Sequence, residues 1–342
     1  MWRRSARRRA ERRLRLARYW QAAGDLDEAA RHAERAVRLL EPEHVYSWAA
    51  ASVTRAQIER DRLEYGAGSA RLAAVVEVLD AQPAGPVVTG LLGRALVSLG
   101  DVHRRAGRYP DATAALNRAC EVLDGSALGA ALTVLAITCK ELGDFPEAAR
   151  LYERVRHIHE ETRPTPAEAA TLQHNLAGLA FAQEAYERAE VHARQAVALR
   201  GRAAAVDQAA DLAVLGAVLG ARGQHREARA CLERAYDVCR RARPPRRYEM
   251  AVHLHTLAAT LEHDDPERAE ALYRQALALK EHLLGPEHPE VAVVCNNLAG
   301  LLNDRQRTAE AIPLLRRALA IAGQAFPPDH PTTAAIRRNL SR

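Results

Sequence analysis

Small and large apolar residues recur along the chain with the spacing of a helical face, and the pattern then repeats. An alanine pair seven residues apart marks each copy, since seven residues return to nearly the same side of a helix. From residue 119 onward, the second members are 36 to 42 residues apart. The copies are Ala29/Ala36, Ala112/Ala119, Ala148/Val155, Ala189/Ala196, Ala228/Ala235, Ala269/Ala276 and Ala311/Ala318. This period predicts an array of small units that bury their apolar faces against one another.

Several alanine pairs are preceded by a six-residue turn sequence, called the turn phrase here, that runs from a glycine to the first alanine of the pair. It is clearest at 107–112 and 143–148. It starts with glycine, which readily takes the left-handed conformation that ends a helix. Pro110 and Pro146 then suit the first turn of the next helix, where no amide hydrogen bond is lost. Asp111 follows near the positive end of that helix. The phrase predicts a helix, a tight turn and a second helix.

A leucine followed by a small residue precedes each turn phrase, on the helix called A here. The small residue allows helix B, the second of the pair, to approach closely. These pairs are Leu99-Gly100, Leu135-Ala136, Leu176-Ala177, Leu215-Gly216, Leu257-Ala258 and Leu298-Ala299. Helical periodicity continues throughout, and no convincing alternating strand pattern interrupts it. The predicted fold class is therefore all-α.

These phrases resemble the tetratricopeptide repeat, and the last units resemble the longer repeat of kinesin light chains. Gly285-Pro286-Glu287-His288-Pro289, followed by Asn296-Asn297-Leu298-Ala299, carries the second resemblance. It implies a right-handed superhelical solenoid of stacked antiparallel helix pairs over residues 13–342. We expect about seven hairpins and a C-terminal capping helix near 332–341.

The repeat pattern is weakest at 43–80, where the alanine pair is missing. The gap between Ala36 and Ala119 leaves room for one degenerate unit. We expect a long helix near 44–64 and its partner near 68–80.

Basic charge is concentrated in an arginine-rich N-terminal arm, residues 1–12. The chain has a net charge of +6, but residues 1–18 contribute +8 and the remainder −2. Contact with nucleic acid is therefore expected only through this arm, with an anionic membrane or an acidic protein as alternatives. The favoured interpretation of the arm is a solvated, frayed extension of the first helix, because no aromatic residues are interleaved with its arginines. Only two lysines occur, so the many arginines and alanines indicate a GC-rich, bacterial genome rather than a selected binding surface.

Cysteine usage and hydropathy favour the cytoplasm. The five cysteines are scattered, with no C-x-x-C pair, which is typical of free thiols in a reducing compartment. No segment approaches the roughly 20 apolar residues that cross a bilayer. The basic arm also lacks the apolar stretch of a secretory signal.

No motif for catalysis or cofactor binding is present. The chain contains no G-x-S-x-G, no P-loop and no dinucleotide-binding glycine pattern. His157 and His159, like His253 and His255, are two residues apart, so their side chains point to different sides of a helix. We therefore expect no enzyme activity, no catalytic residue, no cofactor and no metal site.

The resemblance implies that the A helices line a concave groove that binds peptides. Aligning the units on their Leu-small pairs places the groove residues one and two positions before the leucine and two, five and six after it. The predicted site consists of Arg94, Asp101, Arg104, Arg105, Lys140, His174, Asn175, Phe181, His255, Glu262, Asn296, Asn297 and Asn303. By resemblance, Asn175 and Asn297 would hold a peptide backbone, since amides both donate and accept hydrogen bonds. Capping or bonding between repeats is the alternative role.

These features predict a non-catalytic interaction scaffold whose concave groove binds a peptide segment of a partner protein. The alternative is a regulatory sensor in which a small peptide changes the pitch of the superhelix. Such a sensor would contact nucleic acid, if at all, through the basic arm.

Overall fold

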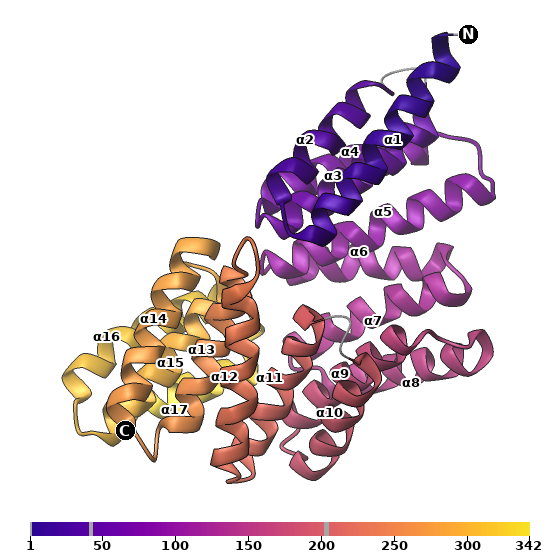
Figure 1. Cartoon of the computed structure of the whole chain (residues 1–342). Helices are drawn as coiled ribbons and strands as arrows, with labels where there is room; N and C mark the ends of the chain where they lie inside the picture. Colours follow the sequence, from indigo (N-terminus) through magenta and orange to yellow (C-terminus); the bar gives the residue numbers. More distant parts are fainter. Residues whose placement is uncertain (1, 41–43, 202–204) are drawn as a thin grey trace. The chain divides into compact units, whose positions relative to one another are not determined.

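The computed structural model describes residues 2–40, 44–201 and 205–342, whose regular structure consists entirely of helices. The chain is an all-α helical repeat solenoid (Figure 1). The helices are α1 (Trp2–Ala23), α2 (Leu26–Arg38), α3 (Val45–Asp61), α4 (Tyr65–Asp80), α5 (Pro86–Arg105), α6 (Tyr109–Val122), α7 (Gly125–Glu141), α8 (Phe145–Thr162), α9 (Pro166–Ala182), α10 (Tyr186–Arg200), α11 (Ala205–Ala221), α12 (His225–Arg241), α13 (Arg247–Leu261), α14 (Pro266–Leu284), α15 (Pro289–Asp304), α16 (Thr308–Ala325) and α17 (Pro331–Leu340).

Odd-numbered helices up to α15 are the A helices and even-numbered ones the B helices, and α17 follows as the expected final helix. The described helices form eight pairs, one more than the count of about seven expected from the sequence. The degenerate segment supplies a complete pair, α3 and α4, close to the predicted limits. It lacks the alanine pair, but α4 buries Leu72, Val75, Val76 and Leu79, which share one helical face.

The chain divides into two compact units, Met1–Thr138 and Cys139–Arg342, called the N-terminal and C-terminal units below. The first contains α1 to α6 and most of α7. The second contains the end of α7 and all helices from α8 to α17.

The turn phrases have the predicted backbone. Gly107, Gly143 and Gly223 have φ values of 72°, 81° and 75°, in the left-handed region. The expected prolines lie in the first turns of α6 and α8, and α8 also has a side-chain cap. Asp144 accepts a hydrogen bond from the Glu147 amide at 3.1 Å, and a proline occupies the first turn of α8. Local sequence therefore determines where these hairpins turn.

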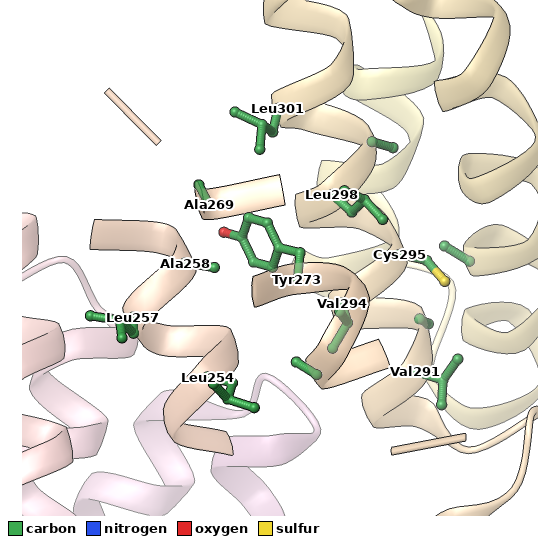
Figure 2. Close-up of a cluster of buried hydrophobic side chains, with 14 of the residues drawn as sticks. Leu254, Leu257, Ala258, Ala269, Tyr273, Val291, Val294, Cys295, Leu298 and Leu301 are labelled. Atoms are coloured by element: carbon green, nitrogen blue, oxygen red, sulfur yellow. The ribbon is translucent and has the colours of Figure 1, made fainter. Parts of the chain in front are cut away.

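The core contains many small side chains, as the repeat predicts. Every alanine of the seven recurring pairs is at most 1% exposed, and so is Val155. Two tyrosines, Tyr152 and Tyr273, are the largest fully buried side chains. Figure 2 shows the Tyr273 ring packed among Ala258, Ala269 and Leu298. The alanines bring helices close together, and a few large side chains fill the remaining space.

Two glycines of α5 allow the close approach of helices to be tested within one helix. A Cβ on Gly100 would lie 2.4 Å from Cγ of the buried Leu116, whereas a Cβ on Gly90 would meet nothing within 4 Å. We expect Gly100→Ala to lower the free energy of unfolding by about 2 kcal/mol through overpacking. Gly90→Ala is expected to raise it by about 0.5–1 kcal/mol, because alanine favours helix.

Urea unfolding of the two variants measures this difference directly. Equal effects of the two substitutions would show that Gly100 has no packing role.

None of the described helices combines the length and apolar composition needed to cross a membrane. The five cysteines are free, and Cys139, Cys239 and Cys295 are buried. Burial raises the pKa of each of these three thiols to about 11.

Candidate functional site

Side chains of successive A helices form rows that run from repeat to repeat. Within each unit these helices pack on one another, as α3 does on α5, α11 on α13 and α15 on α17. Corresponding residues, 41 to 43 positions apart, are joined by hydrogen bonds. The joined residues are Gln57 and Ser98, Arg60 and Asp101, Tyr248 and Glu290, His255 and Asn297, and Asn296 and Asn339. Of the predicted site residues, Asp101, His255, Asn296 and Asn297 take part in these bonds.

In the N-terminal unit, Asp101 is the centre of an arginine cluster. Its carboxylate is bonded by Arg60 at 3.0 Å, Arg104 at 2.8 Å and Arg105 at 3.2 Å. Burial alone would raise the pKa of Asp101, but the three guanidinium groups hold it well below its ordinary value. Arg104 and Arg105, predicted as a positive groove wall, therefore stabilise a buried carboxylate.

Arg94 lines a cavity of about 850 Å³ in the same unit. Its Nε donates to the carbonyl of Gly90 in its own helix at 3.3 Å. The cavity lies among the beginnings of α3, α5 and α7 and the end of α6. Its apolar lining includes Tyr46, Val87 and Leu123. Among the predicted residues, Arg94 therefore lies beside space that suits an apolar side chain.

In the C-terminal unit, His174 belongs to a buried network centred on Asp211. His174 Nδ1 lies 2.9 Å from Asp211 Oδ1, and Arg200 Nε donates to Oδ2 at 2.9 Å. Asp211 is fully buried, which alone would raise its pKa, but the bonds from His174 and Arg200 lower it. The network joins α9, α10 and α11 and fixes the orientation of His174.

Three other predicted residues lie on α9 or beside it. The Lys140 ammonium lies near α9, since a Cβ on Gly178 would be 3.6 Å from it. The Nδ2 group of Asn175 is buried without a hydrogen-bond partner in the described part of the chain. Phe181, at the end of the helix, is 36% exposed, and its ring centre lies 5.6 Å from that of Tyr186. This region therefore combines an unsatisfied amide with an exposed aromatic ring.

The most continuous polar row crosses α13, α15 and α17, and we call it the amide row. It consists of His255, Asn297, Asn296, Asn339 and Asn303. Asn297 donates to His255 Nε2 at 3.1 Å and accepts from Asn296 at 3.2 Å. Asn339 then donates to Asn296 at 3.0 Å, while its backbone carbonyl accepts from Asn303 at 3.0 Å.

Two groups in the amide row remain unsatisfied. Nδ1 of His255 and Oδ1 of Asn303 are buried without a partner among the described residues. The amides of Asn296 and Asn297 use only part of their capacity of two donated and two accepted bonds. The Asn296 and Asn297 amides therefore retain capacity for a ligand that both donates and accepts hydrogen bonds.

Glu262 lies beside the amide row and hydrogen-bonds the Tyr273 hydroxyl, which joins α13 to α14. Burial raises the pKa of Glu262, and burial together with this carboxylate raises that of Tyr273. The two side chains therefore form a structural contact between the helices of one pair.

Sequence reasoning missed the buried groups that hold these rows together. Lys280 of α14 is 5% exposed and forms an ion pair of 2.8 Å with Glu290, which also accepts from the Tyr248 hydroxyl at 2.7 Å. Burial alone would raise the pKa of Glu290, but the Lys280 ammonium lowers it to about 2. The 42-residue separation of Tyr248 and Glu290 matches the repeat period and was the available signal.

The histidine pairs considered from the sequence have separate environments. His253 lies 3.6 Å from the Cys239 sulfur, whereas His255 belongs to the amide row. His157 is exposed beside Glu153 and Glu160. The part of the chain that the structure describes holds no cluster of three potential metal ligands.

Sequence profiles described as tetratricopeptide repeat match most of the chain. The matched residues are 10–35, 93–118, 129–154, 169–207, 208–282, 264–322 and 290–342. A search of curated proteins gave no match to the chain.

Several solved structures are similar to the chain. A Rap protein complexed with Competence and Sporulation Factor has a TM-score of 0.65 and 12% identity, covering 82% of this chain and 78% of its own. The apo form of the quorum sensor NprR from B. thuringiensis has a TM-score of 0.63 and 13% identity, covering 91% and 87%. Kinesin light chain TPR-like repeats from Podosopora anserina have 25% identity and a TM-score of 0.41, covering 56% and 93%. The first two show a shared fold.

Proposed function

Because the chain belongs to the tetratricopeptide repeat family, we propose that it is a non-catalytic cytoplasmic scaffold that binds an extended peptide segment of a partner protein. Stacked helical repeats present long surfaces on which such segments bind. The peptide would lie along the A helices of the C-terminal unit. The Rap protein of similar fold, which is complexed with Competence and Sporulation Factor, supports a ligand-binding role.

The amide row is the observation that carries this proposal. An extended peptide offers one N–H and one carbonyl per residue, and these must be satisfied when they leave water. Asn297 and Asn296 retain donors and acceptors, and His255 Nδ1 and Asn303 Oδ1 have no partner among the described residues. A peptide backbone supplies groups of both kinds. Asn175, on α9, adds an unsatisfied donor three repeats before Asn297.

Combined replacement of Asn175 and Asn297 by alanine tests the proposal. We expect the partner captured from the native host to bind about tenfold more weakly or worse, since two backbone hydrogen bonds contribute at least about 1.4 kcal/mol together. The affinity is measured with the purified partner segment.

The matched control is Gln195→Ala, which removes an exposed amide from the B helix α10. It should leave the affinity unchanged, and urea unfolding should show that all variants remain folded. A folded Asn175→Ala/Asn297→Ala variant with full affinity would contradict the assignment.

A second candidate is a peptide-responsive regulator, and a long-range contact within the C-terminal unit favours it. His330, just before α17, donates from Nε2 to the Glu141 carbonyl at 2.9 Å, and its ring stacks on Phe326 at 4.0 Å. Pro331 lies against Gly143, where a Cβ would be 2.8 Å from its Cδ atom. A ligand that binds better with this contact open would shift the array toward the open state.

Gly143→Ala is expected to open this contact, and Gly223→Ala is its control. Both glycines have positive φ in a turn, so both substitutions carry similar backbone strain of about 1 kcal/mol. A Cβ at Gly223 meets nothing within 4 Å. If the contact regulates binding, only Gly143→Ala changes the partner affinity. Equal affinities of the two variants would exclude this role.

A further inference from the structure

We propose that a basic cleft between α1 and α2 binds an acidic peptide segment whose carboxylates flank an apolar side chain. This surface belongs to the N-terminal unit and is separate from the amide row. The chain would then hold two different protein segments.

The cleft has a volume of about 640 Å³ and arginines on both of its sides. Its lining contains five arginines, two leucines and no acidic residue among those described. The lining residues are Arg9, Arg12, Arg13, Leu16, Arg35, Arg38 and Leu39. Arg9, Arg12 or Arg13, and Leu16 are one helical turn apart, so they share one face of α1.

Part of this positive charge is not neutralised by the protein. Arg12 and Arg35 are exposed and form no ion pair with any described residue. Arg13 donates to His32 Nδ1 at 3.1 Å, and burial together with Arg13 lowers the pKa of that histidine. Arg38, in contrast, has an acidic partner, Glu34, at 3.0 Å.

A neighbouring cavity of about 470 Å³ differs from the cleft because acidic residues also line it. It shares Arg35 and Arg38 with the cleft, but Asp27 and Glu34 also line it. Arg62 is already paired with Asp27 there. The electrostatic attraction for an anion is therefore stronger in the cleft than in the neighbouring cavity.

The chemistry of the lining favours an acidic peptide over nucleic acid. Guanidinium groups bind carboxylates with two parallel hydrogen bonds. Leu16 and Leu39 form an apolar floor that suits a leucine-like side chain. Single-stranded nucleic acid is usually held by aromatic side chains that stack on its bases, and no aromatic residue is among the described residues of the lining.

Fluorescence anisotropy with a short labelled peptide of glutamates and leucines tests this proposal on the full chain. Arg12→Glu/Arg35→Glu should weaken peptide binding by about tenfold or more, since attraction becomes repulsion at two contacts. Arg154→Glu/Arg338→Glu makes the same change in net charge at exposed positions of the other unit. This control should change the affinity by less than about twofold.

Further probes distinguish binding in the cleft from binding to the amide row and from general attraction of anions. A peptide with serine in place of leucine should bind more weakly if the apolar floor takes part. Asn175→Ala/Asn297→Ala should leave the acidic peptide bound, so failure of the amide-row proposal would not affect this one. Three results would each overturn the proposal. The two arginine double variants could lose the same peptide affinity, labelled single-stranded DNA could bind more tightly than the peptide, or the peptide could fail to bind.

Discussion

Asp211→Asn is expected to lower the free energy of unfolding of the C-terminal unit by about 3–5 kcal/mol. Asp211 is fully buried, and the Arg200 side chain that it binds is 10% exposed. Asparagine removes the negative charge and leaves the guanidinium group without compensation in a site with little access to water. Urea unfolding followed by circular dichroism measures the loss.

Asp207→Asn provides the control for Asp211, because Asp207 is exposed and lies one turn earlier on α11. We expect it to change stability by less than about 0.5 kcal/mol. Replacing Asp211 and Arg200 together by leucine and methionine should recover most of the loss, since no charge remains buried. Equal stability of Asp207→Asn and Asp211→Asn would contradict the assigned network.

Mild acid is expected to destabilise the same unit through the buried His253 and the half-buried His255. Burial lowers the pKa of His253 to about 4 and, with help from Lys280, that of His255 to about 3. The unfolded chain has the ordinary value of 6.5, so it takes up protons first as the pH falls. The stability that comes from keeping these two histidines neutral is complete well above pH 6.5 and declines below it. The decline ends when the two histidines of the folded protein also become protonated, near pH 4 and pH 3.

The expected loss between pH 6.5 and about pH 5 is about 1.6 kcal/mol for each histidine, or about 3 kcal/mol for both. Urea midpoints across this interval measure it. His253→Gln/His255→Gln should show a much smaller pH dependence, whereas His157→Gln, at an exposed position, should behave like the wild type. An unchanged slope in the double variant would show that these histidines are not the source.

Local sequence was sufficient to predict the hairpins because short-range chemistry determines them. Gly107 and Gly143 have the left-handed backbone that the turn phrase requires. The Leu-small pairs predicted close helix approach, and Gly100 indeed faces Leu116. The segment at 43–80 was also placed correctly as a helix pair, although its alanine pair is missing.

The rows between repeats were harder to predict, because they depend on how one hairpin is seated on the next. Alignment placed Arg104, Arg105 and Asp101 near one another, but it did not show that the arginines bind the aspartate. Likewise, it did not show that Asn297 binds His255 across a 42-residue separation. The residue types were visible in the sequence, whereas their pairing required the register between helices.

Site-specific photo-crosslinking tests the central claim, binding of a partner peptide along the A helices, most directly. A benzophenone amino acid would replace Phe181 or Thr256 on A helices, or Val191 or Leu199 on the exposed side of the B helix α10. Mass spectrometry of the crosslinked products in extract of the native host identifies the segment captured at each position. The account predicts neighbouring residues of one partner segment at Phe181 and Thr256, and none at Val191 or Leu199. Capture of the partner at the B-helix positions alone would contradict it.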